Sequence, residues 1–150
     1  MTVITVADAV ETKKAVFAIA EHQGPVYLRL SRAAAPVFYP EDMKFEIGRG
    51  IKGREGGDVT IITTGTVLHK ALAAAELLEE KGIRARVVDM HTIKPIDEEL
   101  IIECARETGA IVTVEEHSVC GGLGSAVAEV LAEHMPVPMT RIGATDFAES

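Results

Sequence analysis

The sequence is poor in several residue types, and each shortage excludes a class of protein. It contains no tryptophan, and aromatic residues make up only 4% of its 150 positions. The core must therefore be built from alanine, valine, isoleucine and leucine, which supply most of the 47% hydrophobic content. The only cysteines are Cys104 and Cys120, so we expect no disulfide framework and a reducing, cytoplasmic environment.

Positive charge is also scarce. Lysine and arginine total 15 against 23 aspartate and glutamate residues, which gives a net charge of -8. We expect no nucleic-acid partner, because there is no basic face to displace counterions from phosphates. No apolar run approaches the ~20 residues that span a bilayer, and the N-terminus lacks the pattern of a signal peptide. We therefore expect a soluble globular chain without membrane contact.

What the sequence does contain is a regular alternation of strands and helices. Short apolar runs predict strands at residues 3–6, 24–31, 59–64, 84–90, 110–115 and 137–142, and a glycine-rich edge strand within 45–58. Capping residues and helical spacing predict helices from Asp8, Thr66, Pro95/Asp97 and Leu123. Apolar strands separated by amphipathic helices predict a mostly parallel sheet that is covered on both faces.

The first 32 residues cannot form a domain of their own. They read as one strand–helix–strand unit, and a two-stranded sheet cannot bury its own faces. Either they pack on the rest of the chain, or they are the end of a larger sheet. Two prolines without hydrophobic periodicity follow, at Pro36 and Pro40, and predict a linker with a domain boundary near residue 40.

The segment VEEHSVCGGLGSAVAEVL, residues 114–131, concentrates glycines and reactive side chains between a strand and a helix. Gly122 and Gly124 match the first two glycines of the dinucleotide fingerprint, but Val127 occupies the third position. No acidic residue follows a strand about 20 positions later, as the fingerprint requires. The alternative is that the glycines allow a sharp turn from strand to helix.

The same segment offers two other chemistries. Cys120 and His117 are three residues apart and could form a nucleophile and base, or Cys120 could be an unreactive, small buried thiol. A metal could be held by His91, Glu115, Glu116 and His117, but no paired ligand motif is present. The alternative for Glu116 and His117 is hydrogen bonding to neighbouring loops or to a partner chain.

Arg32 follows a strand in which Val26, Leu28 and Leu30 are expected to face the interior. It continues this face at the point where the chain leaves the sheet. Its planar guanidinium could bind a phosphate or carboxylate there, or pair with an acidic residue across the linker.

Three segments together resemble the C-terminal part of transketolase. They are ADAVETKKAVFAIAEHQGPVYLRLSR, DVTIITTGTVLHKALAAAELLEEKGIRARVVDMHTIKPIDEELI and TGAIVTVEEHSVCGGLGSAVAEVL, and HTIKPIDEE and VTVEEHSVCGGLG are the most specific parts. The likeness covers nearly the whole chain in the same order. Deoxyxylulose-5-phosphate synthase and the β chain of 2-oxoacid dehydrogenases share the outline of this domain.

The resemblance implies a particular organisation. Residues 1–34 would be the end of the domain that binds the pyrimidine of thiamine diphosphate, 35–44 a linker, and 45–150 the transketolase C-terminal domain. That domain would be a three-layer α/β/α fold with a mostly parallel five-stranded sheet and one antiparallel edge strand, the segment FEIGRGIKG. We expect the chain to be a truncated product or one fragment of a split enzyme, ending before a final helix.

The resemblance also implies roles for residues. Arg32 would bind the terminal phosphate of a phosphosugar, and no catalytic, cofactor-binding or metal-binding residue is expected in this chain. The glycine segment would shape a turn in a non-catalytic domain. Gly65, His91 and His117 could form a crest that binds an anion or a regulator, or that serves as an interface.

The expected function is transfer of a two-carbon ketol unit between phosphosugars in the pentose phosphate pathway. Thiamine diphosphate and magnesium would bind the complete enzyme, a homodimer that includes an N-terminal portion or subunit, and not this chain alone. The alternatives are a non-catalytic dimerisation or regulatory module, the corresponding domain of the two related enzymes, and an independent enzyme that uses Cys120 and His117.

Overall fold

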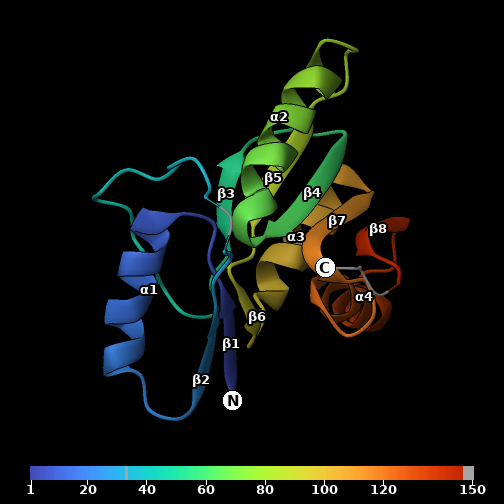
Figure 1. Ribbon diagram of the computed structural model, residues 1–150. Coiled ribbons are helices and arrows are strands. Elements are labelled where there is room, and N and C mark those ends of the chain that lie inside the picture. Colours follow the sequence, from blue (N-terminus) through green and yellow to red (C-terminus); the bar gives the residue numbers. More distant parts are fainter. Residues whose placement is uncertain (33, 147–150) are drawn as a thin grey trace.

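A computed structural model describes residues 1–32 and 34–146. Two sheets are present, and Figure 1 shows the smaller one beside the larger. The strands are β1 (Thr2–Thr5), β2 (Val26–Arg29), β3 (Ile51–Arg54), β4 (Val59–Thr64), β5 (Ala85–Asp89), β6 (Thr92–Lys94), β7 (Ile111–Ser118) and β8 (Met139–Ala144). The helices are α1 (Ala9–Glu21), α2 (Leu68–Glu79), α3 (Glu98–Thr108) and α4 (Leu123–His134), with a short 3-10 turn, η1 (Gly65–Val67).

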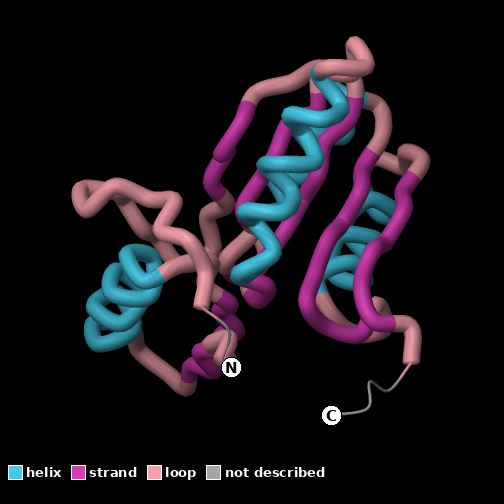
Figure 2. Tube along the Cα trace, turned by 45° about the horizontal axis from the view of Figure 1, so that its top comes forward, coloured by secondary structure: helices cyan, strands magenta, loops and turns pink. Residues whose placement is uncertain are grey.

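The larger sheet has the strand order β3-β5-β4-β7-β8. Strands β5, β4, β7 and β8 run parallel to one another, and β3 pairs antiparallel with β5 at one edge. Figure 2 shows α2 on one face of this sheet. The predicted three-layer α/β/α fold with one antiparallel edge strand is confirmed, and the odd strand lies in the predicted segment.

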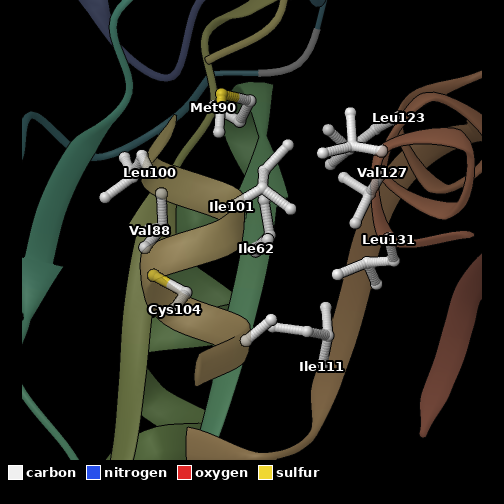
Figure 3. Close-up of a cluster of buried hydrophobic side chains, with 12 residues drawn as sticks. Ile62, Val88, Met90, Leu100, Ile101, Cys104, Ile111, Leu123, Val127 and Leu131 are labelled. Atoms are coloured by element: carbon white, nitrogen blue, oxygen red, sulfur yellow. The ribbon is translucent and has the colours of Figure 1, made fainter. Parts of the chain in front are cut away.

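Alternation along the strands divides the core into two layers. Ile62 and Val88 face α3 and α4, where they pack with Ile101 and Val127 in a cluster that Figure 3 shows between the helices and the sheet. Their neighbours in the sequence point to the other face and pack under α2; these are Ile61 and Val87. Strands that are buried on both faces explain why the runs at 59–64 and 84–90 are almost entirely apolar.

The smaller sheet has the order β2-β1-β6, with β1 parallel to β2 and antiparallel to β6. The sequence does not predict β6, which has only three residues and therefore no readable periodicity. Because β6 comes from beyond the linker, it joins the N-terminal segment to the C-terminal part of the chain. The proposed domain limits at residues 34 and 45 stay a prediction.

The helix boundaries test the capping predictions. Asp8 caps α1 and Asp97 caps α3, and Gly109 ends α3 in the left-handed conformation with φ 69°. The prediction that Thr66 caps α2 is wrong. Thr66 lies within η1, and α2 begins at Leu68 without a side-chain cap. The predicted cap fails because the chain first makes a 3-10 turn after β4.

The α2 face of β7 and β8 is only partly covered. A hollow of about 290 Å³ opens there, lined mainly by apolar side chains of β4, α2, β7 and β8, and Ile142 is 53% exposed. The final helix that the resemblance implies lies outside the described residues. Within those residues, every helix is too short or too polar to span a bilayer.

Truncating the buried face of α3 will destabilise the fold strongly. Ile101 is fully buried, so Ile101→Ala is expected to lower the free energy of unfolding by about 2–5 kcal/mol through lost burial and the cavity left behind. Leu77 on α2 is 60% exposed, and Leu77→Ala should change it by no more than about 0.5 kcal/mol. Urea unfolding of the purified chain measures both; equal effects would contradict the burial pattern.

Candidate functional site

The candidate residues lie at or just after the carboxyl ends of strands, of β2 in the smaller sheet and of β4, β5 and β7 in the larger one. Arg32 comes after β2, Gly65 after β4 and His91 after β5, while His117 and Cys120 lie at and just beyond the end of β7. Carboxyl ends of parallel strands share one edge of a sheet, which is where ligands bind in open α/β folds. Figure 1 shows that the linker and α1 approach this edge of the larger sheet.

Arg32 is exposed, but the strand before it is shorter than predicted. β2 ends at Arg29, and Leu30 is 56% exposed, whereas Val26 and Leu28 pack inward as expected. The alternation therefore stops before Arg32 and does not set the direction of its side chain. Among the described residues Arg32 forms no ion pair, so the alternative of pairing with an acidic residue is not observed there.

A hollow of about 300 Å³ lies beside the chain on both sides of Arg32. It is formed by the first turn of α1, the end of β1, the residues around Arg32 and the turn after β4; the lining residues are Val6, Ala7, Asp8, Ala9, Thr12, Leu30, Ser31, Ala34, Ala35 and Thr66. The N-terminus of a helix carries partial positive charge, and at the start of α1 the carboxylate of Asp8 already complements it.

Asp8 fixes the linker against the first turn of α1. Its Oδ1 accepts a hydrogen bond from the backbone N–H of Glu11 at 2.8 Å. Its Oδ2 accepts from the backbone N–H groups of Phe38 at 2.7 Å and Tyr39 at 2.8 Å. One carboxylate therefore caps the helix and holds residues 38–39 in place beside it.

Gly65 and His91 hold the two sheets together and are both buried. Gly65 has φ 73°, and an added Cβ would lie 2.8 Å from Cγ2 of Thr5, so only glycine fits this close approach. The ring of His91 stacks on Phe45 with centroids 4.2 Å apart, and its Nδ1 is 2.9 Å from Oγ1 of Thr92. Burial lowers the pKa of His91 to about 4, so the imidazole is neutral at pH 7.

Of the three residues proposed as a crest, only His117 is exposed to solvent. His91 has no exposed surface and therefore cannot touch a ligand on the surface of this chain. The nearby Arg29 donates from Nη2 to the backbone carbonyl of Glu116 at 2.6 Å, which ties β2 to the end of β7. An anion-binding, regulatory or interface role for Gly65, His91 and His117 stays a prediction.

The glycine segment is a turn that caps its own helix. Both oxygens of Glu115 accept backbone N–H groups at the start of α4, from Leu123 and Gly124, each at 2.8 Å. A Cβ on Gly122 would lie 2.0 Å from Oε2 of Glu115, which explains the glycine there. The amides that a dinucleotide phosphate would need are thus already occupied by Glu115, a buried residue whose capping role the sequence pattern did not reveal.

The other two chemistries of this segment find little geometric support. The backbone N–H of Cys120 donates to Oγ of Ser118 at 3.2 Å, and Nδ1 of His117 lies 3.1 Å from the carbonyl oxygen of Ser118. No hydrogen bond joins the Cys120 thiol to the His117 ring in the part of the chain that the structure describes. Cys120 is exposed, so the alternative prediction of a buried thiol is wrong. In the same residues, no group of three or more His, Cys, Asp or Glu side chains is placed to hold a metal.

The fold is an α/β domain in which Glu115 caps the glycine-rich turn before α4, where a phosphate-binding protein would hold a phosphate. The model of the "Transketolase, C-terminal domain" family matches residues 48–150. The chain therefore belongs to the transketolase C-terminal domain family, which confirms the resemblance inferred from the sequence.

Individual relatives cover almost all of this chain. It is 48% identical over 146 residues to the 6-deoxy-6-sulfo-D-fructose transketolase subunit of Clostridium sp. strain MSTE9, covering 97% of this chain and 45% of the relative. It is 46% identical to an apulose-4-phosphate transketolase subunit of Phocaeicola vulgatus, covering 97% and 47%.

A solved structure described as "Split gene transketolase, inactive beta4 tetramer" is also similar, with a TM-score of 0.96 and 55% identity over 97% of this chain and 49% of that one. The chain thus spans about half the length of these relatives.

The Glu115 cap generates a stability prediction. Glu115→Gln leaves one oxygen for two N–H donors and is expected to lower the free energy of unfolding by about 1–3 kcal/mol. Glu116→Gln is the matched control, because Glu116 is exposed and its Oε2 accepts only from the Thr66 hydroxyl. Denaturant unfolding at pH 7 compares the two variants, and a Glu115→Gln chain as stable as the control would show that the cap contributes little.

Proposed function

We propose that this chain is the C-terminal part of a thiamine-diphosphate-dependent transketolase, which transfers a two-carbon ketol unit between phosphosugars. The main support is its likeness, over 97% of its length, to named transketolase subunits that are about twice as long. The chain would act together with an N-terminal portion or subunit, in a homodimeric cytoplasmic enzyme of the pentose phosphate pathway.

Two observations support a cofactor site outside this chain. The helix N-terminus with the glycine-rich turn is occupied by Glu115, and the described residues provide no acidic cluster for magnesium. We therefore propose that thiamine diphosphate and magnesium bind to the remaining part of the enzyme. The cofactor supplies the covalent chemistry, and this chain contributes to binding and orientation of the sugar.

Arg32 is the residue of this chain proposed to contact the substrate. Arg32 is exposed, and its neighbours Ser31 and Ala34 line the hollow at the start of α1. Its guanidinium is a planar set of donors that matches a phosphate group. The phosphate lies at the far end of the sugar from the carbons that react. Binding it would use remote binding energy to orient the reactive end.

One prediction concerns the cofactor. The purified chain alone is expected to show no thiamine diphosphate binding by isothermal titration calorimetry with magnesium present, because a ligand held between two domains loses most of its contacts when one is absent. The same titration after mixing with the N-terminal part provides the positive control. Tight binding by this chain alone would contradict the proposed division of roles.

Another prediction concerns Arg32 in the assembled enzyme. Arg32→Ala is expected to raise KM for a phosphorylated sugar roughly 10- to 100-fold through loss of charge-assisted hydrogen bonds. KM for the unphosphorylated sugar should change little, and Arg32→Lys should recover only part of the loss. The control is Arg84→Ala, since Arg84 precedes β5 at the opposite edge of the sheet. Equal effects on both sugars would rule out the phosphate role.

A further inference from the structure

Two acidic side chains meet in the interior where α1, β5 and the linker come together. Glu11 lies in the first turn of α1, and Asp89 is the last residue of β5. Both have 0% exposed surface. Tyr39, from the linker, is also buried and contacts Asp89. The cluster therefore joins the N-terminal segment, the linker and the large sheet at one point.

Each carboxyl group has one oxygen with a clear donor. Oε2 of Glu11 accepts from the backbone N–H of Ala7 at 2.6 Å, and Oδ2 of Asp89 accepts from the hydroxyl of Tyr39 at 2.8 Å. The other oxygens, Oε1 of Glu11 and Oδ1 of Asp89, are buried and have no donor among the described residues. The two carboxyl groups are close enough for each to perturb the pKa of the other, so a hydrogen bond between these two oxygens would give both a partner. Because an ionised carboxylate can only accept, that hydrogen bond requires a proton.

The surrounding charges make full ionisation of the pair unfavourable. Within the described residues, neither Glu11 nor Asp89 belongs to an ion pair, and the negative charge of Asp8 raises the pKa of both. Burial, followed by the charge of Asp89, raises the pKa of Glu11 to about 9. Burial raises the pKa of Asp89 to about 7, although the hydrogen bond from Tyr39 opposes this. Burial also raises the pKa of the Tyr39 hydroxyl, which stays protonated.

We propose that Glu11 and Asp89 share one proton across this junction, and that the resulting acid–carboxylate hydrogen bond fixes α1 on the C-terminal sheet. Glu11 carries the proton and donates through Oε1 to Oδ1 of Asp89. The bond then supplies the missing partner of both buried oxygens at once. It makes Glu11 and Asp89 positioning residues for the first turn of α1.

The proposed Glu11–Asp89 hydrogen bond affects the hollow beside Arg32. Ala7, whose N–H donates to Glu11, and Asp8 both line that hollow. The position of the hollow against the large sheet therefore depends on the shared proton. The importance of this effect for substrate binding rests on the proposed phosphate role of Arg32. The Glu11–Asp89 hydrogen bond itself is a property of this chain and is tested without any activity measurement.

The sign of the pH effect follows from linkage. The unfolded chain loses the Glu11 proton near pH 4.5, whereas the folded chain keeps it to about pH 9. Between these values the folded state binds more protons than the unfolded state, so stability falls as pH rises. One retained proton corresponds to a fall in the folding equilibrium constant that approaches tenfold per pH unit, and the fall ends once the pH exceeds about 9.

Carbon-13 NMR of the side-chain carboxyl groups in the purified chain tests the proton directly. One glutamate carboxyl signal is expected to stay at its protonated position at pH 7.5 and to titrate with a midpoint near 9. The backbone N–H signal of Ala7 should shift with the same midpoint, since this group donates to Glu11. If every carboxyl signal titrates below pH 6, the shared proton does not exist and the proposal is wrong.

A matched pair of variants tests the consequence for stability. Glu11→Gln keeps an acceptor for Ala7 and a donor for Asp89 but cannot ionise, so its unfolding midpoint in urea should be nearly constant between pH 7 and 9. The wild-type chain and the control Glu21→Gln, an exposed position at the end of α1, should both lose stability over this range. Burial raises the pKa of the Cys104 thiol, and because all three chains carry this thiol, comparing them removes its contribution. A Glu11→Gln chain that loses stability in parallel with the control would overturn the proposal.

Discussion

The placement of the N-terminal segment against the larger sheet is the constraint on which the rest of the structure depends. A strand–helix–strand unit leaves the outer edge of its first strand unpaired, and the short β6 fills this edge of β1. The same contact is extended by the N–H of Thr5, which donates to the carbonyl of His91 at 2.8 Å. Since β6 follows β5 after only two residues, the smaller sheet is held directly by the larger one.

Polar contacts add to the apolar packing of Ala7 and Val10 where the two parts of the chain meet. Asp8 accepts from the linker amides, and Arg29 donates to the carbonyl of Glu116. Gly65 removes the side chain that would separate β4 from Thr5. Asp8 is buried, and a buried carboxylate without its partners is costly, so its contacts favour one arrangement of the segment. These contacts also hold Asp8 and the turn after β4, which line the hollow beside Arg32.

Features that depend on neighbouring residues could be predicted from the sequence, whereas contacts between distant segments could not. The caps at Asp8, Asp97 and Gly109 and the edge strand β3 were predictable, because each depends on residues close in the sequence. The β6 pairing, the burial of His91 and the cap supplied by Glu115 were not. Each depends on a segment distant in the sequence, or on a side chain that reaches across a turn. Alternation in β2 correctly placed two apolar residues inward, but it could not show where the strand would end.

The glycine-rich motif after β7 is misleading for the same reason. A glycine-rich turn at the start of a helix offers N–H groups to any anion of the right size, and a phosphate is the usual candidate. In this chain the anion is a carboxylate of the chain itself, which reaches the amides from β7 and leaves no room for a side chain at Gly122. Because the Glu115 carboxylate accepts from these N–H groups, they are not available to bind an external anion. The start of α1, beside the hollow near Arg32, is capped in the same way by Asp8, so both helix N-termini hold a carboxylate of the chain itself.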